Sequence, residues 1–385
     1  MSLIALISAG LLARSFQNTL DIDPGFRSEN ILTLSFNLAD NSYLNEATGQ
    51  NFLRRLQEEA AAVPGVVKSD IGSAMPMFFG GISRTVFVDG RDAGEAEDGI
   101  LVSTSTIGPN YMETMGISLL RGRDFSRVEP KESGTAEGPN YAIVNETMAG
   151  KFWPGEEALG RTFTFYGDDH SVEIIGIAAD SKYGQLAEDP QPFAYLPILQ
   201  SYQDPKFAMN LFVHTAGAPT TVAGDMQAIS RRLDPNVPIT SVLPMTEVVH
   251  RSMLLPRIGA WLVLVFGGLA LFLAGIGVCG VISFSVSQRT HEIGLRMALG
   301  ARSNDAMKLV VRQGLTLSLI SVVIGVLEPF AITRAMSTFL VGVDALDPTV
   351  FGGVAVILAG VSALASYIPA PRATRVDPLT ALRFE

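Results

Sequence analysis

The chain contains one cysteine, and several features that would identify an enzyme are missing. Cys279 cannot form a disulfide within the chain, so an oxidising compartment is permitted but not required. No segment fits the P-loop pattern GxxxxGK(S/T), so the chain cannot hydrolyse ATP by itself. The histidines lack the spacing of metal ligands, and no nucleophile elbow is present, so we predict no metal, cofactor or catalytic set. The histidines are His170, His214, His250 and His291.

Basic residues are scarce over most of the chain. Residues 21–250 hold 31 acidic and 16 basic residues, a net charge of −15, while the remainder carries +5. Without a basic stripe to neutralise phosphates, nucleic-acid binding is excluded. Charged residues are absent from two long runs, 31 residues between Arg257 and Arg289 and 24 between Asp347 and Arg372. A spanning helix needs about 20 residues, so the sequence predicts a membrane protein.

Three full spans and a clipped first span are predicted. The apolar stretch Leu3–Ala13 is too short to cross a bilayer unaided. We interpret residues 1–20 as the outer end of a clipped first transmembrane helix; an interfacial or buried helix is the alternative. Glu328, late in its span, is interpreted as an interfacial or arginine-paired residue rather than a proton relay. The full spans are expected at about 258–286, 309–339 and 350–369.

Loop charges predict the orientation. The loop 287–308 and the tail 370–385 are rich in arginine, and basic loops stay in the cytoplasm. The acidic residues 21–250 then form an extracytoplasmic core domain. Arg14 and Arg334 lie at outer ends of spans, against this trend, but long basic side chains can reach the lipid headgroups.

The extracytoplasmic region shows two separated strand–helix–strand patterns. Leu32, Leu34, Phe36 and Leu38 alternate with polar residues, which is typical of a half-buried strand. Similar patterns fill 21–79 and 206–250, so we predict one α+β subdomain made from these two halves. Residues 80–205 are predicted to be a β-rich insertion. It contains a hairpin whose tip is Gly167-Asp168-Asp169, and a short helix, Asn145–Trp153, capped by Asn145.

Two apolar segments have a functional and a structural interpretation. The run "MPMFFGG" (Met75–Gly81) is either a cargo-facing loop or core packing at a subdomain junction. Small residues in the second span favour close packing against other spans or a second copy, the alternative being a lipid-facing surface. The residues predicted to make this packing contact are Gly267, Ala270, Ala274 and Gly277.

The segment "RTHEIGLRMALGAR" between the second and third spans is short, charged and helix-prone. It predicts a helix over about Thr290–Leu299 that stops at Gly300, with Ile293 and Met297 on one face. Such a helix on the inner membrane face could fit a groove on a partner protein. The alternative is a solvated connector whose bases only set the topology.

This segment resembles the cytoplasmic motif R-x-x-E-I-G-x-x-x-A-(L/I)-G-A of MacB/FtsX-type ABC transporter permeases. The tail "PAPRATRVDPLTALR" and the ectodomain stretch "IVNETMAGKFWPGEEALGRTF" are also similar to that family. The N-terminal stretch resembles one half of a duplicated orphan-type permease. The resemblance implies four spans per module, a large periplasmic core domain after the first span, and a separate ATPase subunit or domain. The matching residues are Arg289, Glu292, Ile293, Gly294, Ala298, Leu299, Gly300 and Ala301.

The resemblance implies a permease module in the bacterial inner membrane that couples ATP hydrolysis to movement of the ectodomain. Expected partners are a separate ABC ATPase, a second permease module or copy, and a hydrophobic cargo or an extracytoplasmic protein. A second hypothesis is a non-transporting regulator that activates a partner such as a wall hydrolase. A membrane-anchored enzyme is disfavoured by the missing catalytic set. The ATPase-coupling residues would be Glu292, Ile293, Gly294, Arg296, Met297, Ala298, Leu299 and Gly300.

Overall fold

The structure is a computed structural model, and its helices and strands fall into two compact units. One unit is Met1–Asp21 together with Leu255–Glu385, and the other, which we call the ectodomain, is Ile22–Leu254. The domain limits drawn from the sequence stay predictions. The structure describes residues 2–20, 22–38, 43, 46–78, 81–88, 99–125, 140–200, 202, 208–288 and 347–367.

Two distant stretches of chain share the first sheet of the ectodomain. Its four antiparallel strands follow the order β11, β1, β10, β2, so strands from the N-terminal stretch alternate with strands from the C-terminal stretch. Both predicted strand–helix–strand patterns are therefore present, and they interlock. The elements are β1 (Ile31–Asn37), α2 (Glu46–Ala61), β2 (Val66–Gly72), β10 (Ala208–Thr215), the 3₁₀ turn η3 (Pro219–Val222), α5 (Ala223–Leu233) and β11 (Ile239–Pro244).

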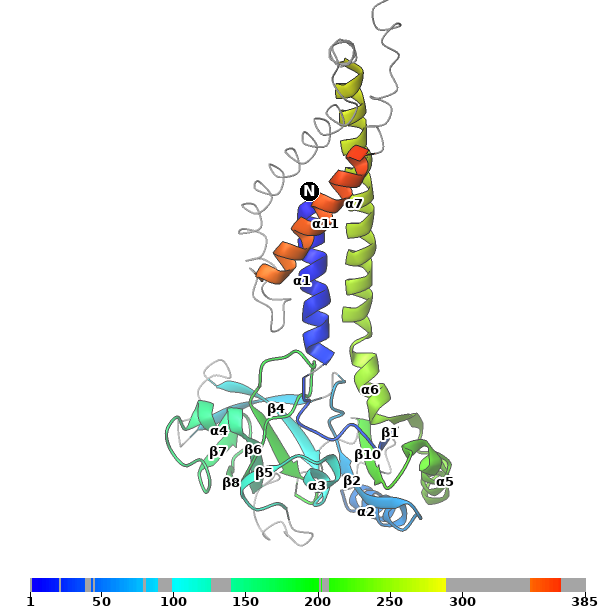
Figure 1. Ribbon diagram of the computed structural model, residues 1–385. Coiled ribbons are helices and arrows are strands. Elements are labelled where there is room, and N and C mark those ends of the chain that lie inside the picture. Colours follow the sequence, from blue (N-terminus) through cyan, green and yellow to red (C-terminus); the bar gives the residue numbers. More distant parts are fainter. Residues whose placement is uncertain are drawn as a thin grey trace, which may run out of the picture. The chain divides into compact units, whose positions relative to one another are not determined.

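The alternation seen in the sequence of β1 decides which face of this sheet the helices cover. Leu32, Leu34 and Phe36 are buried and belong to one core with Leu56 of α2 and Met226 of α5. Figure 1 shows α2 and α5 close together beside these strands. Full burial of each such side chain stabilises the fold by about 1.5–3 kcal/mol, so this core holds the two chain stretches together.

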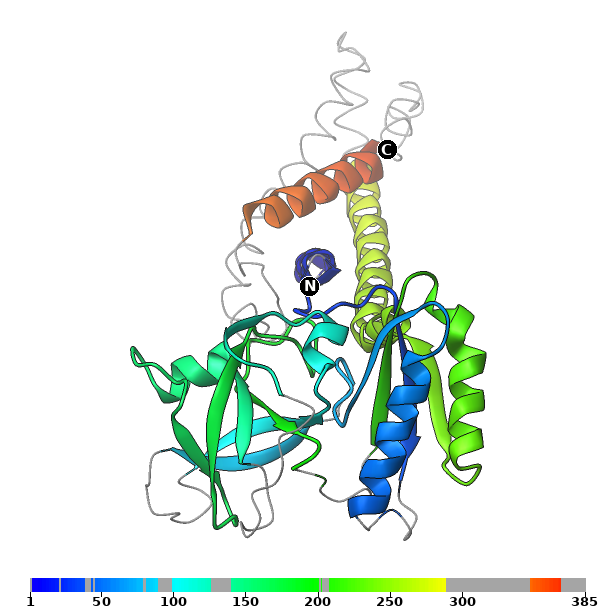
Figure 2. The same cartoon turned by 90° about the horizontal axis from the view of Figure 1, so that it is seen from below.

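The middle of the ectodomain forms a closed barrel. Strands follow the order β4, β3, β7, β8, β6, β9, and a parallel pairing of β9 with β4 completes the ring. Closure leaves no unpaired strand edge within the ring. Figure 2 shows these strands apart from α2 and α5. The elements are β3 (Ile82–Val88), β4 (Ile100–Ile107), α3 (Tyr111–Met115), β5 (Leu119–Gly122), β6 (Tyr141–Asn145), α4 (Glu146–Phe152), β7 (Thr162–Phe165), β8 (Ser171–Ala178) and β9 (Phe193–Pro197).

The predicted hairpin and the predicted helix cap in the barrel are both confirmed. Strands β7 and β8 are antiparallel partners. The Asn145 side chain accepts a hydrogen bond from the Met148 N–H at 3.0 Å, which caps α4. The same oxygen accepts from the Phe193 N–H at 2.9 Å, and the amide group donates to Asp180 at 2.6 Å. One asparagine thus caps a helix and also ties it to β9.

The remaining helices lead into or belong to the other unit. Helix α6 (Met245–Ser252) ends the ectodomain, and only Met253 separates it from α7. Helix α1 begins at Ser2 and continues seven residues past the apolar stretch, to Leu20. The other described helices of this unit are α7 (Leu254–Gln288) and α11 (Pro348–Tyr367).

Candidate functional site

Two of the described helices, α7 and α11, are long and apolar enough to cross a membrane. Large apolar side chains along α7 are exposed; Trp261 is 61% and Phe272 65% exposed. A helix that is apolar on all sides belongs in a lipid or a buried setting rather than in water. The third predicted span, 309–339, lies outside the described residues, and so does Glu328.

Helices α1 and α11 contact each other through a small apolar cluster and an ion pair. Ile7 and Leu11 of α1 pack against Val354 of α11. Arg14 approaches the Asp347 carboxylate to 2.6 Å. Asp347 also accepts the Thr349 N–H at 2.9 Å, which satisfies a free donor at the start of α11. Arg14 was expected to reach lipid headgroups, but here a carboxylate is its partner.

The four small residues of α7 that were predicted to pack against other spans differ in their burial. Gly267 is buried, Ala270 and Ala274 are half-buried, and Gly277 is exposed. A contact with another described span is found beside them, at Gly275, where a β-carbon would lie 3.3 Å from Val361 of α11. Span packing at the four selected positions therefore stays a prediction.

All the predicted ATPase-coupling residues, from Glu292 to Gly300, lie outside the described residues. Their role rests on the sequence motif alone.

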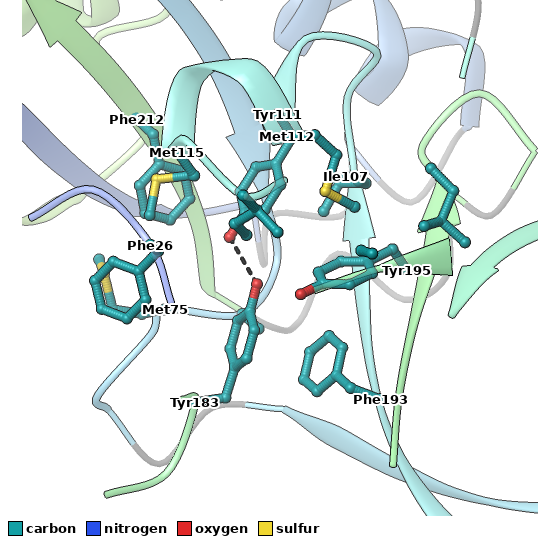
Figure 3. Packing of buried hydrophobic residues seen from close by; sticks show 14 of the residues in the cluster. Phe26, Met75, Ile107, Tyr111, Met112, Met115, Tyr183, Phe193, Tyr195 and Phe212 are labelled. Atoms are coloured by element: carbon teal, nitrogen blue, oxygen red, sulfur yellow. Dashed lines mark hydrogen bonds between the residues drawn. The ribbon is translucent and has the colours of Figure 1, made fainter. Parts of the chain in front are cut away.

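A large apolar core, which we call the junction core, joins the four-stranded sheet to the barrel; we call these two parts the subdomains of the ectodomain. Phe212 of β10 meets Tyr111 of α3 edge to face, with ring centroids 5.4 Å apart. Tyr195 of β9 and Tyr183 belong to the same aromatic group (Figure 3). Aromatic pairs in such arrangements contribute about 0.5–1.5 kcal/mol beyond the area they bury. The junction core thus connects the sheet of the first subdomain to the barrel.

The three tyrosine hydroxyls in the junction core have hydrogen-bonding partners. The Tyr111 and Tyr183 oxygens lie 3.0 Å apart, and Tyr195 lies 2.9 Å from the Ser181 hydroxyl. Burial raises the pKa of Tyr195 to about 12 and also raises the pKa of Tyr111 and Tyr183. These phenols stay protonated at neutral pH, so they serve as neutral hydrogen-bonding groups rather than as acids or bases.

Both chain connections of the ectodomain reach the junction core. Ile22, which follows α1, packs against it. Met245 and Val248 of α6 are buried members of it, and Met253, the residue before α7, packs on it. The first residue of the ectodomain and residues close to its end therefore pack in or on the same apolar core.

The MPM run contributes to this core. Met75 and Met77 are buried in it, whereas Phe78 is 67% exposed. Core packing at the subdomain junction is thus the correct interpretation for the two methionines. Residues 79 and 80 of the run lie outside the described residues.

Polar contacts connect the two subdomains where β2 meets β4, beside a small cleft. We call this boundary the seam. Strands β2 and β4 pair at a single position, Gly72 with Ile107. The buried Asp70 carboxylate accepts the Asn110 N–H and, at 2.9 Å, the Gln57 amide. A β-carbon on Gly108 would lie 1.8 Å from this carboxylate, so the close approach requires glycine there. Asp70 was missed in the sequence, although an acid inside a buried strand is a recognisable signal.

The cleft next to this seam has a volume of about 110 Å³ and is mostly apolar. Its polar groups already have partners: Gln50 donates to the Leu199 carbonyl at 3.2 Å, and Gln57 binds Asp70. A space of this size holds a few water molecules or one small apolar group. Among the described residues, no three histidine, cysteine or acidic side chains gather as metal ligands.

Two family models match successive parts of the chain. A model of the MacB-like periplasmic core domain matches residues 1–246, and a model of the FtsX-like permease C-terminal region matches 264–378. The chain belongs to the MacB/FtsX-type permease family. Its family therefore agrees with the resemblance seen in the loop motif.

Two relatives of this chain are named as export ATP-binding/permease proteins. The macrolide export ATP-binding/permease protein MacB of Mannheimia succiniciproducens is 22% identical over 284 residues, 72% of this chain and 43% of that protein. The pyoverdine export ATP-binding/permease protein PvdT of Pseudomonas entomophila is 24% identical over 266 residues, 66% of this chain and 39% of that protein. This chain thus spans less than half the length of these two relatives.

Solved extracytoplasmic domains are also similar. The periplasmic region of MacB from Actinobacillus actinomycetemcomitans is 14% identical, with a TM-score of 0.41, over 61% of this chain and 97% of that chain. The extracellular domain of the noncanonic ABC-type transporter YknZ is 17% identical, with a TM-score of 0.35, over 55% of this chain and all of that chain.

Proposed function

We propose that this chain is the permease module of an ABC-type export system in the bacterial inner membrane. ATP hydrolysis by a separate ATPase subunit or domain would rearrange the spans, and the spans would move the ectodomain. The order of the two matched family regions supports a permease module. The names of these relatives, which combine ATP binding, permease and export, support an ABC export system.

The observation that carries the mechanical part of the proposal is the convergence of both chain connections on the junction core. Met245 and Val248 are buried in this core, and α7 begins two residues after α6 ends. Ile22, two residues after α1 ends, packs on the same core. Protein interiors are close-packed and transmit displacement, so a shift of either segment would act on both subdomains rather than on a surface loop.

The ATPase would contact the predicted helix Thr290–Leu299, with Ile293 and Met297 entering a groove. The small residues of α7 would let a second module approach closely. An arrangement with the ectodomain outside and the loop 287–308 inside would place the ATPase contact and the moving domain on opposite sides of the membrane.

The test begins with the ATPase. Tagged full-length chain is purified from membranes of its own host after mild cross-linking, and the recovered proteins are identified. We expect a protein with a P-loop. Recovery of none, with the chain present at normal membrane levels, would contradict the ABC assignment.

Transport is tested with the pair in inverted vesicles. The names of the relatives suggest a macrolide and pyoverdine as probes. ATP-dependent accumulation of either probe supports export. An ATPase that binds and hydrolyses ATP while neither probe, nor any of a panel of hydrophobic peptides, accumulates would favour the non-transporting regulator.

A further inference from the structure

The segment between α1 and β1 is fastened to the C-terminal end of α3 by one arginine. The Arg27 N–H donates to the Met115 carbonyl at 2.6 Å. Its guanidinium Nη1 lies 3.3 Å from the Thr114 carbonyl oxygen and 3.4 Å from that of Glu113. The last carbonyls of a helix lack intrahelical partners and attract cations, so Arg27 stabilises this end of α3.

A histidine completes the surroundings of this arginine. Nδ1 of His214, on β10, lies 3.4 Å from the same Nη1 of Arg27. Arginine can only donate, so His214 must present an unprotonated Nδ1 to this contact. The neutral form of His214 is therefore the one that fits the observed arrangement.

The other charged groups beside His214 come from β2 and α3. Lys68 is the residue opposite His214 in the β2–β10 ladder. Lys68 forms an ion pair with Glu113 of α3. His214 thus has the cations Arg27 and Lys68 on two sides, and the nearby carboxylate, Glu113, is already engaged. A proton on His214 would add a third positive charge to this group.

We infer that Arg27 and His214 form an acid-opened latch between the segment that follows α1 and helix α3. Above the titration range of His214, Nδ1 accepts from Arg27 and the latch is closed. In acid, the protonated ring repels Arg27, and the guanidinium leaves the carbonyls of α3. Any effect of this latch on transport would rest on the proposed function. The latch itself does not depend on that function.

The direction of the pKa shift agrees with a latch that is closed at neutral pH. Burial, and then the charge of Arg27, lower the pKa of His214 below its ordinary value of 6.5. The unfolded chain binds the proton more readily, so the closed form loses stability as the pH falls below 6.5. Opening is thus an event of acidic surroundings.

The segment that follows α1 is also attached to the loop after β8, and this limits how far it can move when the latch opens. The Pro24 carbonyl accepts the Lys182 N–H at 2.8 Å. Gly25 has φ of +76°, and a β-carbon there would lie 2.2 Å from the Asp180 carbonyl oxygen. Release of the Arg27 guanidinium leaves these contacts in place, so the segment would stay attached to the loop after β8. Its attachment to α3 would be reduced to the bond between the Arg27 N–H and the Met115 carbonyl, which is then less protected.

Hydrogen exchange in the full chain, in lipid nanodiscs and without ATPase or cargo, tests the latch. Exchange of peptides covering residues 24–30 is compared at about pH 5 and about pH 8 after correction for the intrinsic rate. We expect about fivefold weaker protection of the Arg27 amide in acid, and no change in peptides from β8. Equal corrected protection at the two pH values in the wild type would overturn the latch.

Two histidine variants assign the effect. Glutamine at position 214 can accept from Arg27 but does not titrate, so His214→Gln should keep the segment protected at both pH values. His250→Gln, at an exposed position on α6, is the matched control and should behave like the wild type. Acid-induced deprotection that persists in His214→Gln would refute the latch. Since no ATPase is present, these outcomes do not depend on whether the chain transports.

Discussion

The ectodomain and helix α7 use the same apolar residue types in opposite ways. In β1, Leu32, Leu34 and Phe36 are buried against helices, whereas Trp261 and Phe272 of α7 are mostly exposed. Burial of apolar surface contributes about 25 cal/mol per Å², so the ectodomain gains stability from its own interior. Helix α7 can gain as much only from lipid or from other spans. The ectodomain is thus stabilised by burying its own apolar side chains. Helix α7 must instead bury its apolar side chains against lipid or other spans.

The two regions also hold their polar groups differently. In the ectodomain, buried Asp70 and Asn145 each join segments far apart in the sequence. In the described helices of the other unit, Arg14 and Asp347 form an ion pair in which Arg14 is partly exposed. Buried hydrogen bonds are costly to break, whereas exposed ion pairs contribute little. Substitutions should therefore have graded effects.

The largest effect is expected in the loop 287–308, which the sequence predicts on the inner membrane face. Met297→Asp would place an unpaired carboxylate in the groove of the ATPase, at a cost of several kcal/mol. Binding should weaken by orders of magnitude, while the ectodomain and the spans are unaffected. Co-purification of the ATPase at equal membrane levels measures this. Asn304→Asp, in the same loop but beyond the predicted helix, is the control. Equal recovery with Met297→Asp would show that the helix is only a connector.

Aromatic truncation should separate the two regions. Phe212→Ala removes a buried ring of the junction core and should cost about 3–5 kcal/mol. Phe272→Ala, at an exposed position of α7, should change the same measurement by less than about 0.5 kcal/mol. Urea unfolding is followed by Trp153 fluorescence in a Trp261→Phe background, since the chain has two tryptophans. An unchanged midpoint with Phe212→Ala would mean that the barrel unfolds independently of the junction core.

A smaller loss is expected at the helix cap of the barrel. Asn145→Ala removes the cap of α4 and leaves the Phe193 N–H without its partner, so we expect about 2 kcal/mol of destabilisation. Lys151→Ala, at the exposed far end of the same helix, should stay within about 0.5 kcal/mol. The Trp153 signal reports both. Similar losses for the two variants would mean that the cap contributes no more than a surface residue.

The smallest effect should come from the ion pair between α1 and α11. A β-carbon on Gly10 would lie 3.9 Å from that of Val350, which suits a disulfide. Cysteines at these two positions, in a Cys279→Ala background, report how often the helices meet. Arg14→Gln should slow disulfide formation about twofold, because a partly exposed pair contributes less than about 1 kcal/mol. A loss of cross-linking altogether would mean that the ion pair, rather than the apolar cluster, holds these helices.

Local patterns in the sequence were sufficient for much of the fold and for the family. The uncharged runs predicted helices at α7 and α11, because a bilayer excludes charge over about 20 residues. The alternation in β1 and the side chain of Asn145 predicted a strand face and a helix cap, since both depend on neighbours a few residues away. The loop motif predicted the family, although the coupling role of its residues stays a proposal.

Only the tertiary structure decided which distant segments meet. The parallel closure of β4 on β9, the Tyr111–Tyr183–Phe212 group, the Arg14–Asp347 pair and the Arg27–His214 contact each join residues that no local pattern relates. A period-2 or helical pattern states which face of an element is apolar but not which element covers it. The choice of partner depends on the summed packing of all the elements, and that sum exists only once the chain has folded.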